Sequence, residues 1–449
     1  MNTGILNLFR ISEIRNKIFL TLGLLIVYRI GFHIPVPGVN VGLMKQMAED
    51  YASSGMGMIF GIMSTLSGGA MGSCALFSLG VMPYISASII FSLLVKVVPA
   101  LERISKEGAQ GQKLINKYAR WTTLLFCVIQ GMFVIQGYLK VSVEQGSGLI
   151  APELFNSFWY KMMLLIAFSS GTIFIMWIGE QITEHGIGNG ISLIIMGGII
   201  ARMPSQFRML YRDLDPGDRM STFAVLMGLY VAIIIGIVYV TRGQRRIPIQ
   251  QAKLTRGRKV YGGQRHYLPL KVNQAGVMPI IFASALFILP PILGKIFGAE
   301  RFFDEVFAWG SFWYVIFYTG LIFFFAFFWT ALMFQPTEIA NNLKESGGFV
   351  PGLRPGKRTA DYLENVMYRV TLAGATFLAV IAVMPHFITK QLKQIPAYVA
   401  VFLGGTSILI VVGVILDLVD KLNSQLLMRN YEGFTSGGAT SSWAKGRKR

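Results

Sequence analysis

The amino-acid sequence predicts an all-α integral membrane protein with ten transmembrane helices, and three observations support this prediction. Of the 449 residues, 53% are hydrophobic and only 14% are charged. Several uncharged segments are about 20 residues long, which is the length that a helix needs to cross about 30 Å of hydrocarbon. Lys and Arg residues gather in alternate connections between these segments. A soluble domain of this length would instead alternate apolar and polar faces along each helix.

The positions of the apolar segments define the predicted spans. The first of them is expected to be a retained helix and not a cleaved signal peptide, because no small-residue cleavage site follows it. The ten predicted spans lie at residues 18–34, 75–95, 121–139, 159–178, 188–201, 222–240, 275–293, 311–334, 367–387 and 396–418.

The distribution of Lys and Arg predicts that both termini lie in the cytoplasm. With the N-terminus placed inside, 29 of the 41 Lys and Arg fall in inside segments and 11 in outside segments. Cytoplasmic connections of membrane proteins carry such an excess of positive charge. One outside connection, 202–219, departs from this rule because it carries four Arg, which Asp213, Asp215 and Asp218 offset in part.

Ten spans can be divided into two halves of five, spans 1–5 and spans 6–10. An odd number of spans per half forces the halves into opposite orientations, and in such inverted repeats the working path lies at their interface. The predicted parts are an N-terminal half (1–201), an outer loop with span 6 (202–240), a basic cytoplasmic loop (241–271), spans 7 and 8 (272–334), a second cytoplasmic loop (335–366), spans 9 and 10 (367–418) and a basic cytoplasmic tail (419–449).

The segment "MIFGIMSTLSGGAMGSCALF" (58–77) is apolar, but four glycines and several serines interrupt it. It therefore makes a poor full span. Backbone of this kind is tolerated at membrane depth only where protein encloses it or where it lines an aqueous cavity. Two interpretations stay open from composition alone, a re-entrant segment and a surface loop with an interfacial helix.

The sequence contains no recognisable catalytic, metal-binding or nucleotide-binding motif. Apart from charges within two residues of a span end, Arg29 is the only charged residue in the predicted spans, whereas ion-coupled transporters hold ionisable groups at mid-membrane. Cys74 and Cys127 lie in apolar segments and are expected to be small buried side chains. The four histidines fall on different predicted loops, and "GLRPGKR" (352–358) lacks the spacing and the Ser or Thr of a phosphate loop. We therefore expect no enzyme activity, no cofactor and no metal site, so that any work is powered from outside.

Six longer motifs occur along the chain, and they carry a family resemblance. They are "FHIPVPGVN" (32–40), "SLGVMPYISASII" (78–90), "GEQITEHGIGNGISLII" (179–195), "RKVYGGQRHYLPLKVNQAGVMPIIFAS" (258–284), "NNLKESGGFVPGLRPGKRTADYL" (341–363) and "GGTSILIVVGVILDLV" (404–419). In this order they resemble the corresponding segments of bacterial SecY, the central channel subunit of the Sec protein translocase. The resemblance covers all ten spans almost without a gap and implies a central hourglass pore with a re-entrant plug half-helix.

The resemblance also implies the residues that form the pore. A ring of bulky aliphatic side chains would narrow the channel at mid-membrane, where a narrow apolar constriction repels water and hydrated ions by dewetting. The implied ring consists of Val81, Ile85, Ile195, Ile281 and Ile410. Val stands at position 81, where Ile is common in the family, and this could loosen the seal.

Two further elements of the channel follow from the same resemblance. The plug would be formed by residues 60–73, with Phe60, Gly68, Gly69 and Ser73 as its named members. A lateral gate would open between spans 2–3 and spans 7–8, with polar side chains from Ser86, Ser88 and Gln130. Such polar groups are equally expected in ordinary helix–helix packing.

The loop 241–271 carries nine Lys or Arg and no acidic residue, and three interpretations stay open. The charge could fix orientation and contact anionic lipids, bind the acidic face of a partner, or bind nucleic acid. The loop is long enough to project as a hairpin that turns at Gly262–Gly263. The resemblance implies docking of the SecA motor or of the ribosome, with its RNA, through this loop and the one between spans 8 and 9. The implied contacts are Arg256, Arg258, Lys259, Arg354, Lys357 and Arg358.

Together these features predict a protein-conducting channel of the bacterial cytoplasmic membrane. It would pass unfolded preproteins with signal sequences across the membrane and release hydrophobic helices into the bilayer, beside the small membrane subunits SecE and SecG. One rival is a secondary transporter for a small solute, which would need a compact polar site at the midplane. A second rival is a passive membrane docking site for ribosomes, which would be indifferent to changes in the aliphatic ring.

Overall fold

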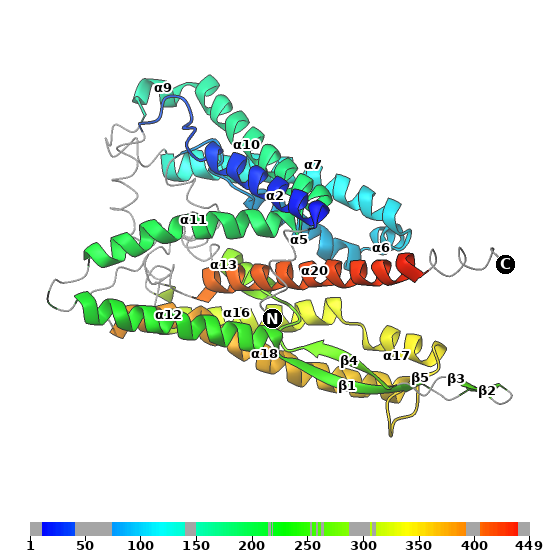
Figure 1. The fold of residues 1–449 in the computed structure, drawn as a ribbon. Coiled ribbons are helices and arrows are strands. Elements are labelled where there is room, and N and C mark those ends of the chain that lie inside the picture. The colour runs from blue at the N-terminus through cyan, green and yellow to red at the C-terminus, as the bar shows by residue number, and fades with distance from the viewer. Residues whose placement is uncertain are drawn as a thin grey trace. The chain divides into compact units, whose positions relative to one another are not determined.

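The computed structural model describes most of the chain, and the described part is mostly helical (Figure 1). It separates into two compact units, of which unit 1 comprises residues 1–205 with 414–449 and unit 2 comprises residues 206–413. The described residues are 11–40, 74–139, 150–213, 217, 219–251, 254–256, 259–261, 265–286, 306–307, 311–391 and 405–438.

Unit 1 is a group of helices packed around α10. Helix α5 packs on α7, and α10 contacts α2, α5, α7 and α9. The side chains that α10 buries recur every three or four residues, so that one broad stripe of the helix faces its neighbours. The elements are α2 (Ser12–Gly31), α5 (Met82–Val97), α6 (Pro99–Lys106), α7 (Ala109–Phe133), the π-helical turn η3 (Val134–Leu139), α9 (Pro152–Asn156), α10 (Phe158–His185), most of α11 (Gly190–Asp213) and most of α20 (Gly405–Gly438).

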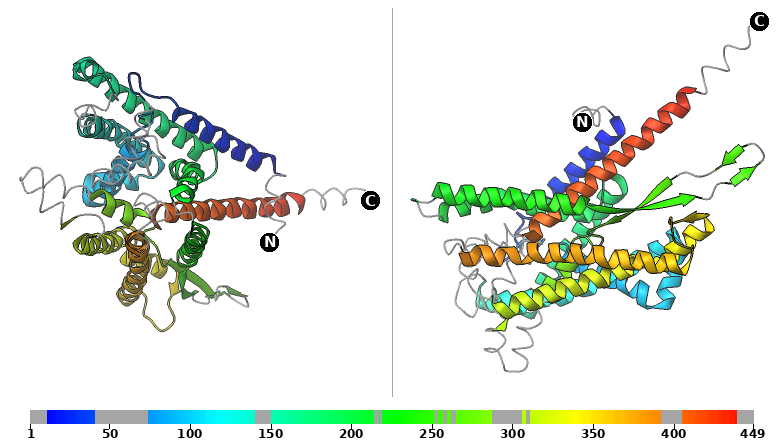
Figure 2. Two further views of the ribbon diagram at one scale, coloured as in Figure 1. Left: turned by 90° about the vertical axis from the view of Figure 1, so that its left-hand side faces the viewer. Right: turned by 90° about the horizontal axis from the view of Figure 1, so that it is seen from below.

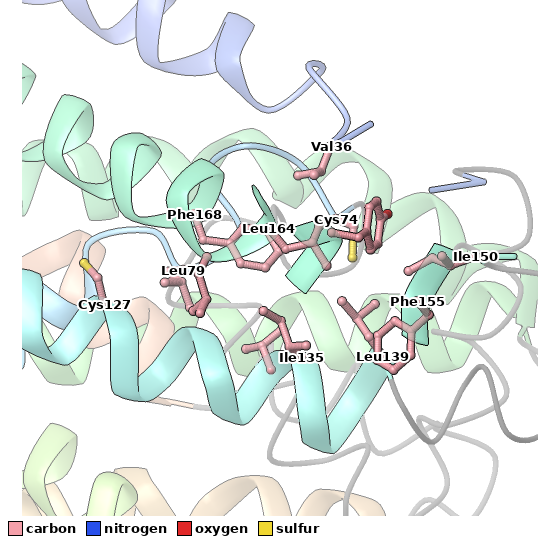
Figure 3. Close-up of a cluster of buried hydrophobic side chains, with 13 residues drawn as sticks. Val36, Cys74, Leu79, Cys127, Ile135, Leu139, Ile150, Phe155, Leu164 and Phe168 are labelled. Atoms are coloured by element: carbon pink, nitrogen blue, oxygen red, sulfur yellow. The ribbon is translucent and has the colours of Figure 1, made fainter. Parts of the chain in front are cut away.

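Figure 3 shows an apolar cluster that holds these helices together. Its fully buried members include Leu164 and Phe168 of α10 and Leu139 of η3. Cys74 and Cys127 also lie in this cluster as free buried thiols, as the sequence predicted. Burying a Leu or Phe side chain contributes about 1.5–3 kcal/mol when the reference is water. Between helices in lipid, where the reference is not water, van der Waals packing supplies part of the stabilisation instead.

Unit 2 combines long helices with a small sheet. In Figures 1 and 2, β1 starts at the end of α12, and among the strands β2 and β3 lie farthest from that helix. The sheet order is β4-β1-β5, and β2 and β3 pair separately. The elements are α12 (Arg219–Arg242), β1 (Gln244–Gln251), β2 (Leu254–Arg256), β3 (Lys259–Tyr261), β4 (Arg265–Lys271), α13 (Met278–Leu286), α16 (Phe312–Met333), α17 (Pro336–Glu345), β5 (Gly348–Phe349), α18 (Lys357–Gln391) and the first residues of α20 (Gly405–Gly438).

Six helices among the described residues are long and apolar enough to cross a membrane, and α5 with α6, bent by 96°, forms one further broken pair. Several boundaries differ from the predicted spans. Helix α5 starts at Met82 and not at 75, and α11 continues to Asp213 through Pro204. Helix α18 starts within the predicted second cytoplasmic loop, and α20 continues into the predicted tail. Hydropathy marks where lipid ends, but a helix continues as long as its backbone bonds and its packing permit.

Candidate functional site

Two connections far apart in the sequence join in one small sheet of unit 2. Strands β1 and β4 form an antiparallel hairpin in which Gln250 lies opposite Arg265. On its other edge β1 pairs with β5, where Gln250 lies opposite Phe349. The loop between α12 and α13 and the loop between α16 and α18 are therefore parts of one surface, which we call the basic loop surface.

An apolar core beneath the sheet fixes this surface on the helices. Ile247 of β1 and Leu270 of β4 pack with Val350 from the second loop and with Leu363 of α18. Ile247 is 1% exposed and Leu363 is fully buried. Since the hairpin, the loop and the helix share one core, we expect them to move as one body.

The outer face of the hairpin carries cationic and aromatic side chains. Side chains alternate between the faces of a strand, and Ile247 and Ile249 point into the core. Arg246 therefore belongs to the opposite face, and the antiparallel register adds Tyr267 and Lys271 to it. All three are exposed, with Tyr267 at 59%. The sequence analysis did not single out these three residues, although the alternation in "QRRIPIQ" is a signal that could have found them.

The predicted turn of the hairpin is wrong. Arg256 pairs with Lys259, so the two residues that connect β2 and β3 are Gly257 and Arg258. A two-residue loop with Gly first favours a tight hairpin turn, whereas Gly262–Gly263 falls between β3 and β4. Of the three predicted contacts in this loop, Arg256 and Lys259 occupy paired backbone positions of β2 and β3, and Arg258 lies outside the described residues.

Arg354 is exposed on a loop whose backbone is fixed by a hydrogen bond from a buried side chain. The Thr359 hydroxyl, which is buried, donates a hydrogen bond to the carbonyl oxygen of Arg354 at 2.9 Å. Gly352 and Gly356 have φ angles of 83° and 103°, a region that glycine adopts without steric cost. The main chain at Arg354 is thus fixed, while its guanidinium faces solvent.

The cations of this loop lie where they do not help the helix that follows. Lys357 and Arg358 are exposed in the first turn of α18, next to Arg354. The N-terminus of a helix carries a partial positive charge, so that each cation there destabilises the helix by about 0.3–1 kcal/mol. Three cations at this position do not stabilise the fold. They do create a local field that attracts phosphate or carboxylate.

In unit 1, residues 74–80 precede α5 without forming a helix, and we call them the buried connector. Nearly all of these residues are buried, although the sequence predicted span 2 from residue 75. The backbone is satisfied by a short antiparallel bridge, in which Val36 N–H donates to the Cys74 carbonyl at 3.0 Å and Leu76 N–H donates to the Ile34 carbonyl at 2.9 Å. Non-helical backbone at membrane depth needs such enclosure by protein.

Two glycines allow the neighbouring helices to enclose the connector. A methyl group at Gly31 of α2 would overlap the Phe77 ring, and one at Gly171 of α10 would overlap the carbonyl of Leu76. Cys74 has a positive φ of 39°, which is unfavourable for a residue with a side chain. The conformation of the connector therefore depends on the close approach of α2 and α10 and on a strained backbone at Cys74. Hydropathy alone reveals neither feature.

The structure distributes the five predicted ring residues between the units. Val81 caps α5 at 3% exposure, and Ile85 lies one turn further on, in the same apolar cluster. Ile195 of α11 is 9% exposed. In unit 2, Ile281 of α13 is half-buried and Ile410 of α20 is 6% exposed. The predicted plug, with Phe60, Gly68, Gly69 and Ser73, lies outside the described residues.

Two of the three predicted gate residues contact each other. Gln130 Nε2 of α7 donates to Ser86 Oγ of α5 at 3.4 Å, and Ser86 Oγ donates to the Met82 carbonyl at 3.0 Å. Gln130 Oε1 is buried and has no hydrogen-bond partner within the described part of the chain. Ser88 is half-buried on α5. The bond joins spans 2 and 3, which form one side of the predicted seam.

An ion pair adds a second link between α7 and α10. Arg120 Nε lies 2.8 Å from Glu180 Oε1, and the Glu180 side chain is 23% exposed. Exposed ion pairs contribute only about 0–1 kcal/mol, and this one is half shielded. It therefore serves mainly to fix the orientation of the two helices.

A row of polar and aromatic side chains crosses three helices of unit 2. Ser284 of α13 and Tyr318 of α16 share a hydrogen bond of 3.0 Å, Tyr318 stacks on Tyr314, and Tyr314 meets the His386 ring of α18 at 4.9 Å. His386 is thus buried in a helix, within predicted span 9 and not on a loop. No group of three His, Cys, Asp or Glu among the described residues could hold a metal ion.

The fold is that of the protein-conducting channels. A solved structure described as "The structure of a protein conducting channel" aligns with a TM-score of 0.59 and 16% identity, covering 94% of this chain and 96% of that one. A structure on the plug domain of SecY gives 0.57 and 17% at the same coverage, and Sec61 in the canine ribosome–channel complex gives 0.55 and 16%.

The sequence comparisons then define the family. A family model described as SecY matches residues 75–419. The curated relative in Thermotoga maritima, "Protein translocase subunit SecY", is 40% identical over 436 residues, covering 96% of this chain and 97% of the relative. The subunit of Haemophilus influenzae is 40% identical, covering 94% and 93%, and that of Mycobacterium tuberculosis is 38% identical, covering 97% and 100%. The chain therefore belongs to the SecY family of translocase channel subunits, and the predicted resemblance is confirmed.

Proposed function

We propose that this chain conducts unfolded preproteins across the bacterial cytoplasmic membrane and releases hydrophobic helices sideways into the bilayer. The single observation that carries the proposal is its membership of the SecY family over nearly the whole chain. As a channel subunit it performs no covalent chemistry. The ten spans, the two inverted halves and the N-in, C-in topology are parts of this proposal, and the excess of Lys and Arg in alternate connections supports them.

The seal is assigned to the aliphatic ring. Val81 and Ile85 are packed in one apolar cluster of unit 1, where Ile195 is also buried, and Ile281 and Ile410 are the corresponding positions of unit 2. Branched aliphatic side chains require no fixed hydrogen bond from a passing polypeptide, so they can separate and close again. A narrow apolar constriction excludes hydrated ions when nothing passes.

The plug and the gate complete the channel. The plug is assigned to residues 60–73, immediately before the buried connector. The anchored connector supports this assignment, because a segment that leaves and returns needs a fixed base. The gate lies beside α5 and α7, whose Ser86–Gln130 bond keeps that side of the seam together. Hydrogen bonds of this kind contribute about 0.6–2 kcal/mol in membranes, which is low enough for reversible opening elsewhere along the seam.

The basic loop surface is assigned to docking of a motor ATPase such as SecA, or of a ribosome. Its joint presentation of Arg354 and the hairpin on one core supports this role. Sec61 and Ssh1 have been solved on ribosomes. SecE and SecG are the expected membrane partners, and anionic lipids are a further expected contact of the cytoplasmic cations.

Reconstitution into liposomes tests the proposal. Preprotein should become protected from protease only when SecE, the motor and ATP are present. Uptake of a small solute by the chain alone, without transport of preprotein, would instead establish the rival transporter.

A substitution in the ring separates a channel from a passive docking site. Ile85→Thr should raise ion leakage through the resting complex while ribosome binding is retained. Ile233→Thr on α12 is the control, because Ile233 is a buried isoleucine that lies outside the predicted ring, whereas Ile85 is half-buried. Equal leakage from both variants would remove the ring from the mechanism.

A further inference from the structure

The end of the α11–α12 pair opposite the hairpin carries positive charge on the side where membrane proteins usually avoid it. Residues 202–219 contain four Arg and no Lys. Two of them, Arg208 and Arg212, lie four residues apart on α11, share one face of the helix and are exposed. No ion pair among the described residues involves either of them. Within the described part of the chain, both guanidiniums are therefore available to a ligand.

Aromatic contacts fix this end of the helix pair. Phe207 of α11 meets Tyr230 of α12 edge to face at 5.8 Å, and Tyr211 meets Phe223 in the same way at 5.7 Å. The Arg219 guanidinium lies 5.2 Å from the centre of the Tyr211 ring. These contacts join the last turns of α11 to α12, so the depth of this end of α11 can be inferred from α12.

Exposed side chains of α12 indicate where the hydrocarbon begins and ends. Met220 is 77% exposed and Tyr239 is 81% exposed, at the two ends of an exposed apolar stripe. At 1.5 Å per residue the segment between them is about 28 Å long, which matches a hydrocarbon core of about 30 Å. Tyr211 contacts the first turns of α12, so it lies at the level of the headgroups. Arg212 lies at the same level, and Arg208 lies one turn deeper, where a long side chain reaches outward to the phosphates.

We propose that Arg208 and Arg212, with Tyr211 between them, bind the phosphate of an anionic phospholipid on the membrane face opposite the basic loop surface. A guanidinium matches a phosphate with two parallel hydrogen bonds, which an ammonium does not, and this explains the absence of Lys. The half-exposed Tyr211 contributes an amphipathic ring of the kind found at membrane interfaces.

Three Asp residues in the same connection leave it without a large net charge. The binding therefore depends on two placed guanidiniums and not on a general positive field. Its role would be to hold the connection between the two predicted halves, α11 to α12, at a fixed depth. This inference does not depend on the proposed transport function, because it requires only that α12 spans the membrane.

Lipid retention by the purified translocase complex tests the proposal. The complex is reconstituted into nanodiscs of phosphatidylcholine with a minor fraction of phosphatidylglycerol, extracted in mild detergent and examined by native mass spectrometry for bound phosphatidylglycerol. Each guanidinium near the surface should contribute about five-fold in affinity. Arg208→Gln with Arg212→Gln should therefore reduce retention by about 25-fold, and replacing both by Lys should restore it only in part.

Lys161→Gln is the matched control. Lys161 is a cation near the start of α10 whose ammonium lies 5.1 Å from the centre of the Phe155 ring, and it is predicted on the same membrane face. This variant should retain phosphatidylglycerol like the wild type. Equal retention by wild type and the double Gln variant would overturn the proposal. So would displacement of the lipid by millimolar inorganic phosphate, because the site would then bind free anions.

Discussion

Replacing Gly171 by alanine tests how the connector is held. The added methyl group would meet the Leu76 carbonyl, with the carbonyl carbon only 2.9 Å away. The obstacle is backbone, which cannot move aside as a flexible side chain does. Overpacking of this kind costs about 1–3 kcal/mol, and we take the upper value. Gly→Ala in a helix interior restores about 1 kcal/mol, so we expect a net loss of about 2 kcal/mol in the free energy of unfolding.

Gly228→Ala on α12 supplies the control. Gly228 also lies inside a helix, but an added methyl group there would meet nothing within 4 Å. This variant should be stabilised by up to about 1 kcal/mol, so that the two alanine variants should differ by about 3 kcal/mol. Equilibrium unfolding in mixed micelles of mild and denaturing detergent measures both. If the two variants agree within about 0.5 kcal/mol, the tight enclosure of the connector by α10 is refuted.

Two further predictions concern hydrogen bonds. Thr359→Val removes the donor that holds the Arg354 carbonyl and should lower stability by about 0.5–1.5 kcal/mol and weaken motor or ribosome binding, while Thr359→Ser should restore both. A binding assay with both variants checks this, and unchanged binding by the Val variant would contradict it. Ser284→Ala and Tyr318→Phe should show a coupling of about 0.6–2 kcal/mol in a double-mutant cycle measured by unfolding. Purely additive effects would show that the bond between α13 and α16 contributes nothing.

Much of the fold follows from the sequence because burial in lipid is a local property. A window of uncharged residues long enough to cross the bilayer is recognised without knowledge of its neighbours. The limits of the helices were harder to predict. Helix α11 continues past Arg202 and Pro204, and α18 starts well before its apolar part, because a helix can leave the membrane without ending.

The candidate site was predictable only in part. The motif around Arg354 identified the second loop, but the sequence contains no sign that this loop pairs with β1 through Phe349. Ser86 and Gln130 were assigned to the same gate, yet their bond to each other depends on how α5 meets α7. The outer face of the hairpin required the strand register, which decides on which side Arg246 lies.

By itself the sequence determined that the chain is a helical membrane protein of the SecY family. Hydropathy, charge bias and motifs are local properties of the sequence and do not depend on tertiary contacts. Only the tertiary structure decided that residues 74–80 form an enclosed connector and not the first turns of span 2. That outcome depends on two glycines from two other helices: Gly31 leaves room for the Phe77 ring, and Gly171 leaves room for the Leu76 carbonyl. The burial of His386 against Tyr314 likewise depends on contacts between helices, and the position of His386 in the sequence does not reveal those contacts.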